Sequence, residues 1–267
     1  MIFITGGAGS IGSSVTREFI NMGEKVTVFD SSEYGLFKLK QEFGNKIKCT
    51  LGSLKDRGVI LNKIFMECDV IHLASIKNIV ITEDSPRELI YSNIVGTLNL
   101  IDAARQAGVR RFLTVSSDKS VEYTTMYGAS KFLQEKMTLW ANNRDYDGKY
   151  SVIRMVNVKE TNGNVFETWK KQHDRGEPLT LTDPYMKRHI LTLKEATKFI
   201  ISAWMEMKGG EIFVPKSQEY YMVELAKEIS NNIKIIGIRH GEKVEEKIMT
   251  DMERTKGIEK NGMVVIK

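Results

Sequence analysis

Short apolar runs alternate with longer amphipathic segments over the first 157 residues. The apolar runs predict strands at 2–5, 25–29, 46–51, 70–74, 111–116 and 151–156. The amphipathic segments predict helices from a glycine turn to about residue 22, and at 36–43, 58–66, 86–107 and 126–142. Because strands and helices take turns in this way, the pattern predicts a doubly wound parallel sheet of the α/β class with helices on both faces.

The pattern becomes shorter and richer in turns after residue 157. We expect a helix at 165–175, strands at 179–182 and 189–193, a helix from there to 207, a strand at 211–215, a helix at 223–229 and a strand at 234–238. We interpret residues 158–267 as a smaller α/β lobe that binds substrate over the carboxyl ends of the sheet. Segments at about 194–215 are expected to return to the large domain, 1–157.

Composition narrows the class of protein further. The chain has 267 residues, of which 42% are hydrophobic and 27% charged, with a formal net charge of +5. The basic residues are scattered among acids, so we expect no nucleic-acid partner, and the mild positive charge suits an anionic small molecule. A strand pattern directly after Met1 and the lack of a long apolar run predict a cytoplasmic protein with no membrane contact. Cys49 and Cys68 predict buried small side chains, and neither the cysteines nor the four dispersed histidines predict a metal site.

A glycine-rich turn follows the first predicted strand and opens the first predicted helix. Its glycines are Gly6, Gly9 and Gly12, with Ser10 and Ile11 between the last two. Glycines let backbone N–H groups approach a pyrophosphate closely, and the helix N-terminus adds a positive partial charge. In this context the turn predicts a Rossmann dinucleotide-binding domain rather than a turn made for packing alone.

Acidic and small side chains after the second strand indicate which dinucleotide binds. Asp30 ends that strand, and a carboxylate there accepts hydrogen bonds from the adenosine ribose and repels a 2′-phosphate. Ser31 and Ser32 follow without a basic neighbour, so we expect NAD rather than NADP. Asp56 ends a third strand–turn unit and either contacts adenine or caps a helix.

A tyrosine and a lysine lie four positions apart at the start of the helix predicted at 126–142. Lys131 is one turn after Tyr127 on the same face, so we expect its ammonium to lower the pKa of the phenol and make it a base. Ser116 and Ser117 close the preceding strand at its carboxyl end, where open α/β sheets bind ligands.

Together these motifs resemble the extended short-chain dehydrogenase/reductases. More narrowly, the chain resembles the UDP-N-acetylglucosamine 4,6-dehydratases of polysaccharide and pseudaminic acid synthesis, which are hydro-lyases. The segments that carry the resemblance are 5–12, 30–34, 72–75 with Lys77, 93–97, 116–119, 127–131 and 239–243. It implies that Leu73, Ala74, Ser75, Lys77 and Asn93 help to bind the cofactor, together with Tyr127 and Lys131.

The resemblance implies a three-part reaction. Tyr127 takes the proton of the sugar C4 hydroxyl while hydride leaves C4 for NAD, a neutral Lys119 removes the C5 proton, and Asp118 protonates the departing C6 hydroxyl. Hydride then returns to C6, and the product is a 4-keto-6-deoxy sugar nucleotide. Taken alone, an Asp-Lys pair after a strand is typical of surface charge. Beside the Tyr-Lys pair it indicates catalysis, and Ser117 belongs to the same catalytic group.

The resemblance also places a UDP-sugar in the lobe. It implies substrate contacts from Lys77, Asn157, Thr180, Thr182, Arg188, Arg239 and Glu242. Arg188 would pair with the diphosphate through its bidentate fork. The family has glycine where this chain has Val156, and a Gly-Ser-rich loop where this chain has 159–165.

Other interpretations stay open at this point. A sugar-nucleotide 4-epimerase or another C4 oxidoreductase is the alternative within the family, and a non-catalytic dinucleotide-binding protein is the alternative outside it. The sequence leaves open whether C5 inverts, which base and C2 substituent the substrate carries, and in which pathway the protein acts. We expect a homo-oligomer. By analogy with similar enzymes, the helices at 86–107 and 126–142 would pair across a two-fold axis.

Overall fold

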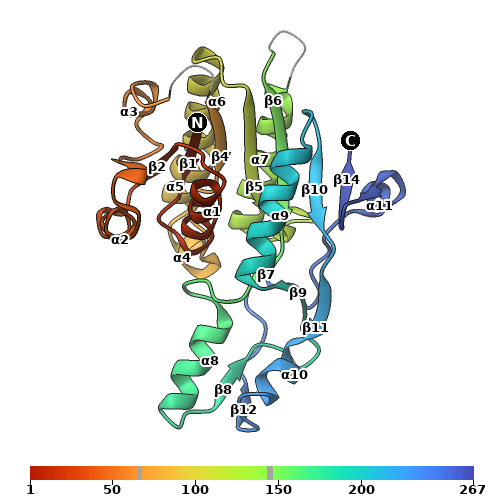
Figure 1. Ribbon diagram of the computed structural model, residues 1–267. Helices are drawn as coiled ribbons and strands as arrows, with labels where there is room; N and C mark the ends of the chain where they lie inside the picture. The colour runs from red at the N-terminus through yellow and green to blue at the C-terminus, as the bar shows by residue number, and fades with distance from the viewer. Residues whose placement is uncertain (65–67, 143–146) are drawn as a thin grey trace.

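A large, mostly parallel sheet lies at the centre of the computed structural model, which describes residues 1–64, 68–142 and 147–267 (Figure 1). Within these residues nine strands follow the order β13-β14-β10-β6-β5-β4-β1-β2-β3. They are β1 (Ile2–Thr5), β2 (Val26–Asp30), β3 (Ile47–Leu51), β4 (Asp69–His72), β5 (Arg111–Ser117), β6 (Lys149–Met155), β10 (Ile212–Pro215), β13 (Ile258–Lys260) and β14 (Met263–Ile266). All neighbours from β3 to β10 pair in parallel, whereas β14 is antiparallel to β10 and β13 to β14. The predicted fold class is therefore confirmed.

Each face of the sheet is covered by its own set of helices. One face packs against α1 (Ser10–Asn21), α2 (Glu33–Phe43) and α9 (Leu193–Glu206), and the other against α3 (Arg57–Leu61), α6 (Gly96–Gln106) and α7 (Met126–Ala141). The side chains of β1 alternate between the two faces: Ile2 and Ile4 join the first apolar cluster, whereas Phe3 joins the second. Successive side chains of a strand point to opposite faces of the sheet, and helices cover both faces. Each central strand is therefore buried on two sides, which explains its unbroken run of apolar residues.

Two of the predicted helices differ from the expectation. The helix predicted at 86–107 is divided into α5 (Pro86–Leu89), a π-helical turn η2 (Ile90–Val95) and α6. The helix predicted at 58–66 is α3, which ends at Leu61, and residues 65–67 lie outside the described residues. The pattern also did not mark the short helix α4 (Ile79–Asp84) or the 3₁₀ turns η1 (Gly44–Lys46) and η3 (Asp118–Ser120).

A smaller lobe lies at the carboxyl end of the sheet, at the bottom of Figure 1. It contains β7 (Asn157–Val158), α8 (Val165–Asp174), β8 (Leu179–Leu181), β9 (Lys187–Leu191), β11 (Gln218–Tyr221), α10 (Met222–Lys227) and β12 (Ile233–Ile235). Trp169, Leu181, Met222 and Leu225 pack in its own apolar core. Strands β11, β9 and β7 form one small sheet, and β12 pairs with β8.

Later segments of the chain return to the large sheet. Helix α9 packs against α1, and β10 pairs with β6. The hairpin of β13 and β14, preceded by α11 (Asp251–Lys256), also joins this sheet, although the pattern did not mark it. The division into domains at 1–157 and 158–267 stays a prediction. In the described ranges no helix combines the length and apolarity that crossing a bilayer requires.

A buried ionic cluster ties the C-terminal arm to the sheet. Arg154 on β6 donates to both carboxylate oxygens of Glu135 on α7, at 3.1 and 2.8 Å, and to Glu253 on α11, at 2.9 and 3.1 Å. Ser120 in η3 donates to the same Glu135 at 2.5 Å. Because Arg154 and Glu135 are almost fully buried, each charge depends on the other for its solvation.

We expect Glu135→Gln to lower the free energy of unfolding by about 3 kcal/mol, because it leaves Arg154 short of a buried counter-charge. Glu253→Gln removes the same charge at a position with 22% side-chain exposure, and should cost about 1 kcal/mol. Urea unfolding followed by circular dichroism measures both. Equal losses would show that burial of the cluster does not decide its contribution.

Candidate active site

One cleft of about 1260 Å³ runs from the glycine turn to the smaller lobe. Of the residues predicted for the site, all but Asp56 and Asn93 line it. The carboxyl ends of β1, β2, β4, β5 and β6 all reach this cleft, because parallel strands end at one edge of the sheet. The topology therefore brings together motifs that are far apart in the sequence.

The glycine turn is tightly packed against its neighbours. Gly6 has a φ of +69°, and a Cβ there would lie 2.6 Å from the backbone nitrogen of Ala74. A Cβ on Gly12 would lie 2.2 Å from the carbonyl oxygen of Gly6. Among the described residues no side chain caps α1, so its first-turn N–H groups face the cleft at Ser10 and Ile11. This cradle fits a pyrophosphate.

Asp30 lies where a ribose-binding carboxylate is expected, whereas Asp56 does not line the cleft. Asp30 accepts one hydrogen bond at each oxygen, from the N–H of Ala8 at 3.0 Å and of Ser32 at 2.9 Å. Each oxygen keeps a lone pair for a ribose hydroxyl. Asp56 accepts from the N–H of Val59 at 3.1 Å and caps α3, which was the other interpretation of this residue. Ser53 and Leu54 line the cleft in its place.

Asn93 is fully buried in the π-helical turn and does not line the cleft. Its amide accepts from the N–H of Ile76 and donates to the carbonyl of Ile76, both at 2.9 Å. It also donates to Ser130 at 3.1 Å. The side chain of Asn93 therefore holds the loop after β4, which lines the cleft, and its part in binding the cofactor stays a prediction. The wide π turn allows this inward position.

Tyr127 and Lys131 lie together in the cleft, but their electrostatics differ from the expectation. Burial raises the pKa of Tyr127 to about 12, and the nearby cation that opposes this shift is Lys119. Lys131 points its ammonium at the carbonyl of Val115, 2.8 Å away, and at Gln134, 2.5 Å away. Burial lowers the pKa of Lys131 itself to about 7. The expectation that Lys131 lowers the pKa of Tyr127 is therefore wrong for this structure.

Asp118 and Lys119 form a buried ion pair in the turn η3, directly after β5. The Lys119 ammonium lies 3.1 Å from Oδ1 of Asp118, which also accepts from Ser117 at 2.8 Å. Burial lowers the pKa of Lys119, whereas the negative charges of Asp118 and Glu246 raise it. The effect of the two carboxylates is the larger, so the pKa of Lys119 lies above its ordinary value. The neutral Lys119 expected from the sequence is thus absent from the resting arrangement, in which the amine carries its proton.

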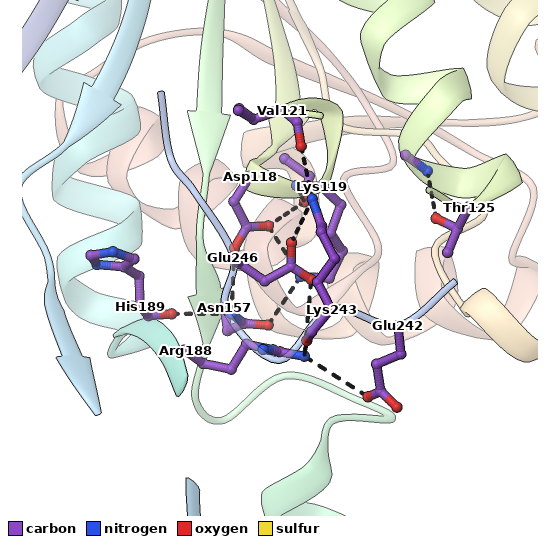
Figure 2. A network of polar contacts seen from close by, with 12 residues as sticks. Asp118, Lys119, Val121, Thr125, Asn157, Arg188, His189, Glu242, Lys243 and Glu246 are labelled. Atoms are coloured by element: carbon purple, nitrogen blue, oxygen red, sulfur yellow. Dashed lines mark hydrogen bonds and ion pairs between the residues drawn. The ribbon is translucent and has the colours of Figure 1, made fainter. Parts of the chain in front are cut away.

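Side chains from the lobe close around this pair (Figure 2). Asn157 donates to the carbonyl of His189 at 3.1 Å, and its amide oxygen lies 3.4 Å from the Lys119 ammonium. Arg188 is buried and donates to the carbonyls of Lys243 and Val244, at 2.8 and 2.9 Å. Much of its donor capacity is therefore used within the protein rather than left free for a diphosphate.

The remaining lobe residues line the cleft at its outer end. Thr180 accepts from Gln172 at 2.9 Å, and Thr182 donates to the sulfur of Met186 at 3.4 Å. The backbone N–H of Arg239 donates to Glu242 at 3.2 Å. Lys77 donates to the carbonyl of Asn162 at 3.0 Å. The N–H of Asn162 donates to the hydroxyl of Ser10 at 3.0 Å, so the loop at 161–164 lies against the glycine turn.

Glu246 was not predicted from the sequence as a site residue. This side chain lines the cleft, is 4% exposed, and has one carboxylate oxygen 3.8 Å from the Lys119 ammonium. The only signal was its place three residues after the segment at 239–243, which carries part of the family resemblance. No periodicity predicts that this carboxylate turns inward.

His72 lies beneath the site at the end of β4. Its Nδ1 lies 2.8 Å from the hydroxyl of Thr5, and its Nε2 lies 2.9 Å from that of Thr97. Gln134 extends this series of hydrogen bonds by donating to the hydroxyl of Thr97 at 2.7 Å. Burial and the nearby Lys131 lower the pKa of His72 to about 3, so the ring is neutral and structural, as its place in a buried strand predicted.

The fold and this site define an extended short-chain dehydrogenase/reductase of the nucleotide-sugar dehydratase and epimerase class. The chain belongs to the polysaccharide biosynthesis protein family, whose model matches residues 2–267. In the part of the chain that the structure describes, no group of three or more histidine, cysteine or acidic side chains is arranged to hold a metal ion.

Several relatives match along most of the chain. A protein of Methanocaldococcus jannaschii named as an uncharacterized membrane protein is 37% identical over 94% of this chain and 81% of its own length. The UDP-N-acetylglucosamine 4,6-dehydratase (inverting) of Campylobacter jejuni serotype O:23/36 is 34% identical over 92% of this chain and 76% of its own. The UDP-glucose 4-epimerase of Rickettsia massiliae is 30% identical over 96% and 79%. The crystal structure of Pen from Bacillus thuringiensis has a TM-score of 0.93 at 31% identity, covering 99% of this chain and 87% of that one.

We expect the free energy of unfolding to fall as the pH drops from 6.5 towards about 3, because His72 stays neutral in the folded chain while it gains a proton in the unfolded chain. The contribution of this one group is about 1.4 kcal/mol per pH unit. Urea unfolding of the wild type and of His72→Gln at several pH values measures this contribution. It is the difference between the two proteins in the slope of the free energy of unfolding against pH. His173→Gln, on the exposed side of α8, controls for loss of a histidine as such, and parallel slopes for wild type and His72→Gln would contradict the assignment.

Proposed function

We propose that this protein is an NAD-dependent nucleotide-sugar 4,6-dehydratase that converts UDP-N-acetylglucosamine or a close analogue to a 4-keto-6-deoxy sugar nucleotide. The observation that carries the proposal is the buried Asp118–Lys119 pair beside Tyr127 in one cleft. Oxidation at C4 alone needs a single base, whereas loss of water also needs an acid and a second base. The similarity to the Campylobacter jejuni dehydratase supports the same choice.

The cofactor would lie along the glycine turn. The N–H groups at the start of α1 would hold its pyrophosphate, and Asp30 would accept hydrogen bonds from its adenosine ribose. The carboxylate of Asp30 and the lack of a basic side chain at 31–34 support NAD over NADP. When bound, NAD supplies the group that accepts hydride from C4 and returns it at C6.

The proton taken from the C4 hydroxyl has a path to Asp118. Tyr127 would take it as a phenolate, and the Ser117 side chain lies close enough to lower the pKa of Tyr127. Ser117 in turn donates to Asp118 at 2.8 Å. Asp118 is a carboxylate again once it has protonated the departing C6 hydroxyl, and a proton that then moves along these three side chains from Tyr127 restores both the phenolate and the carboxylic acid for the next turnover.

The Asp118–Lys119 pair also holds the right number of protons for elimination. An ammonium beside a carboxylate contains as many protons as an amine beside a carboxylic acid, and the two forms differ by one transfer over 3.1 Å. In the second form Lys119 removes the C5 proton and Asp118 protonates the oxygen leaving C6. This transfer requires no exchange with solvent, which suits a carboxylate that is only 1% exposed.

The substrate would occupy the end of the cleft between the catalytic turn and the lobe. We propose contacts to the sugar nucleotide from Asn157, Thr180 and Thr182, and from the remaining donors of Arg188. Arg239 and Glu242 lie at the outer rim of the same cleft, and Lys77 lies between the glycine turn and the loop at 161–164.

A sugar-nucleotide 4-epimerase is the second candidate, because relatives named UDP-glucose 4-epimerase match 96% of the chain. An epimerase leaves C5 and C6 intact and has no use for a buried acid–base pair, so Asp118 and Lys119 favour the dehydratase. The stereochemistry at C5 follows from the face that is reprotonated, and both outcomes agree with the proposal.

We also expect two copies of the chain to pair through the segments at 86–107 and 126–142. Exposed apolar side chains on these segments support this arrangement; they include Tyr91, Leu98, Leu133 and Trp140. Large apolar side chains gathered on neighbouring helices are typical of a contact surface.

Incubation of the purified protein with UDP-N-acetylglucosamine, followed by mass spectrometry, tests the function. We expect a product that is lighter by one water. We expect Lys119→Met to lower the rate of water loss by about 10²- to 10⁴-fold, while reduction of the bound cofactor, followed by absorbance, continues in part. Lys216→Met, which removes an exposed lysine paired with Glu259, is the control.

An isomer of unchanged mass from the wild type would favour the epimerase instead. Water loss at the normal rate in Lys119→Met would remove that residue from the mechanism.

Asp30→Asn should weaken NAD binding at least about tenfold, because a charge-assisted contact to the ribose hydroxyls is worth more than about 1.4 kcal/mol. Calorimetric titration of NAD into protein freed of cofactor measures the change. The variant should narrow the preference for NAD over NADP, since the carboxylate no longer repels a 2′-phosphate. Unchanged affinities for both dinucleotides would overturn the role given to Asp30.

A further inference from the structure

A third carboxylate faces the catalytic pair from the C-terminal half of the chain. Glu246 is 4% exposed and lines the cleft opposite Asp118, with the Lys119 ammonium between them. Figure 2 shows its side chain directed at Lys119 rather than towards solvent. The reaction proposed above gives Glu246 no role, although burying a carboxylate is costly unless its charge is used.

The backbone around Glu246 is fastened from two sides. Arg188 donates to the carbonyls of Lys243 and Val244, and the N–H of Lys187 donates to the carbonyl of Val244 at 2.8 Å. From the other side, the Lys243 ammonium donates to the carbonyl of Val121 at 2.8 Å, directly after the turn η3. These contacts fix the segment across the catalytic turn, so the position of the Glu246 carboxylate is set in advance of substrate binding.

Four charged or titratable groups face the Lys119 amine. Asp118 lies at 3.1 Å and Glu246 at 3.8 Å, while Arg188 on β9 and Tyr127 on α7 lie on the other sides. The two carboxylates together outweigh both the burial and the nearby guanidinium, since the pKa of Lys119 is raised. Glu246 is therefore close enough to the amine to change the pKa of Lys119, which a distant surface charge is not.

Glu246 has its own cationic neighbours but keeps one oxygen without a hydrogen bond. Its Oε1 lies 4.0 Å from Arg188, and its Oε2 lies 3.4 Å from Lys243. Within the described residues Oε2 is buried and has no hydrogen-bond partner. An incompletely satisfied carboxylate next to a base is an arrangement that can respond when charge appears on that base.

During elimination the charge on Lys119 changes. Once Asp118 has become a carboxylic acid, it no longer offers Lys119 a negative charge. As the amine then takes the C5 proton it becomes an ammonium, and the carboxylate that remains beside it is Glu246. A fixed negative charge that faces a base as the base becomes cationic stabilises the transition state, as the aspartate of a serine protease does for its histidine.

We propose that Glu246 is a positioning residue for Lys119, which holds the amine towards the sugar ring and stabilises the positive charge that the amine gains as it takes the C5 proton. The second half of this proposal, the stabilisation of charge on Lys119 during the reaction, rests on the proposed dehydratase function. The first half, that the charge of Glu246 holds the Lys119 amine in place and so sets its proton affinity, is a property of the protein without substrate.

The matched pair Glu246→Gln and Glu245→Gln separates the two halves. Glu245 precedes Glu246 and is exposed, so the control removes the same charge from the same segment. Competitive labelling of amines with acetic anhydride over a pH series, read for the Lys119 peptide by mass spectrometry, gives the pKa of Lys119 without substrate. We expect Glu246→Gln to lower it by about one unit, and Glu245→Gln to leave it at the wild-type value. An unmoved Lys119 titration in a folded Glu246→Gln protein overturns the proposal, whatever the enzyme does.

The pH profile of water loss tests the catalytic half. Activity is lost at alkaline pH when Lys119 gives its proton to solvent, so a lower pKa of Lys119 moves that limit to lower pH. We expect Glu246→Gln to shift it by about one pH unit and to slow water loss about tenfold or more, with cofactor reduction less affected. Glu246→Asp keeps the charge and should restore part of the rate and of the pKa. A variant that slows every step equally, with an unshifted profile, would show a merely structural role.

The two experiments fail in different ways. Absence of water loss in the wild type rejects the proposed function, while the labelling result still decides whether Glu246 controls Lys119. Normal water loss in the wild type with identical labelling curves for both variants rejects the inference and keeps the function.

Discussion

Burial of the Asp118–Lys119 pair is the constraint around which the site is organised. Of the two opposite charges at the end of β5, the Asp118 side chain is 1% exposed and the Lys119 side chain 18%, so the carboxylate depends on partners from the protein. Ser117 and Asn157 provide such partners from the same strand edge and from β7. Glu246 adds a negative charge from a segment more than a hundred residues later. The smaller lobe thus contributes to the electrostatics of the pair as well as to the shape of the cleft.

A second ionic cluster lies on the other side of the same turn. Arg154 joins Glu135 on α7 to Glu253 on α11, and Ser120 connects this cluster to η3. The turn that carries Asp118 and Lys119 is therefore held from the helix side by one cluster and from the lobe side by the other. Fixed dipoles and charges of this kind need not reorganise when charge moves on the substrate, which is the physical basis of electrostatic catalysis.

The two lysines of the catalytic site are held differently. Lys131 is buried among Val115 and Gln134 with a lowered pKa, whereas Lys119 is held between carboxylates with a raised pKa. Spacing along the chain suggested that Lys131 would control Tyr127, but the orientation of its ammonium towards the interior makes Lys119 the cation that acts on the phenol. The resting site therefore holds its tyrosine protonated, and a base at this position has to be formed by proton transfer within the site.

Local patterns in the sequence determined the parallel sheet, the positions of its first six strands along the chain, the glycine turn and the place of Tyr127, Asp118 and Lys119. Each of these depends on a few neighbouring residues or on strand and helix periods. The π turn that buries Asn93 and the hairpin of β13 and β14 were decided by tertiary packing. The direction in which Lys131 and Glu246 point was decided in the same way, since it depends on carbonyls and charges supplied by distant segments. A single sequence records which charges exist, but burial and the partners brought by the fold decide which of them face one another and therefore which protons can move.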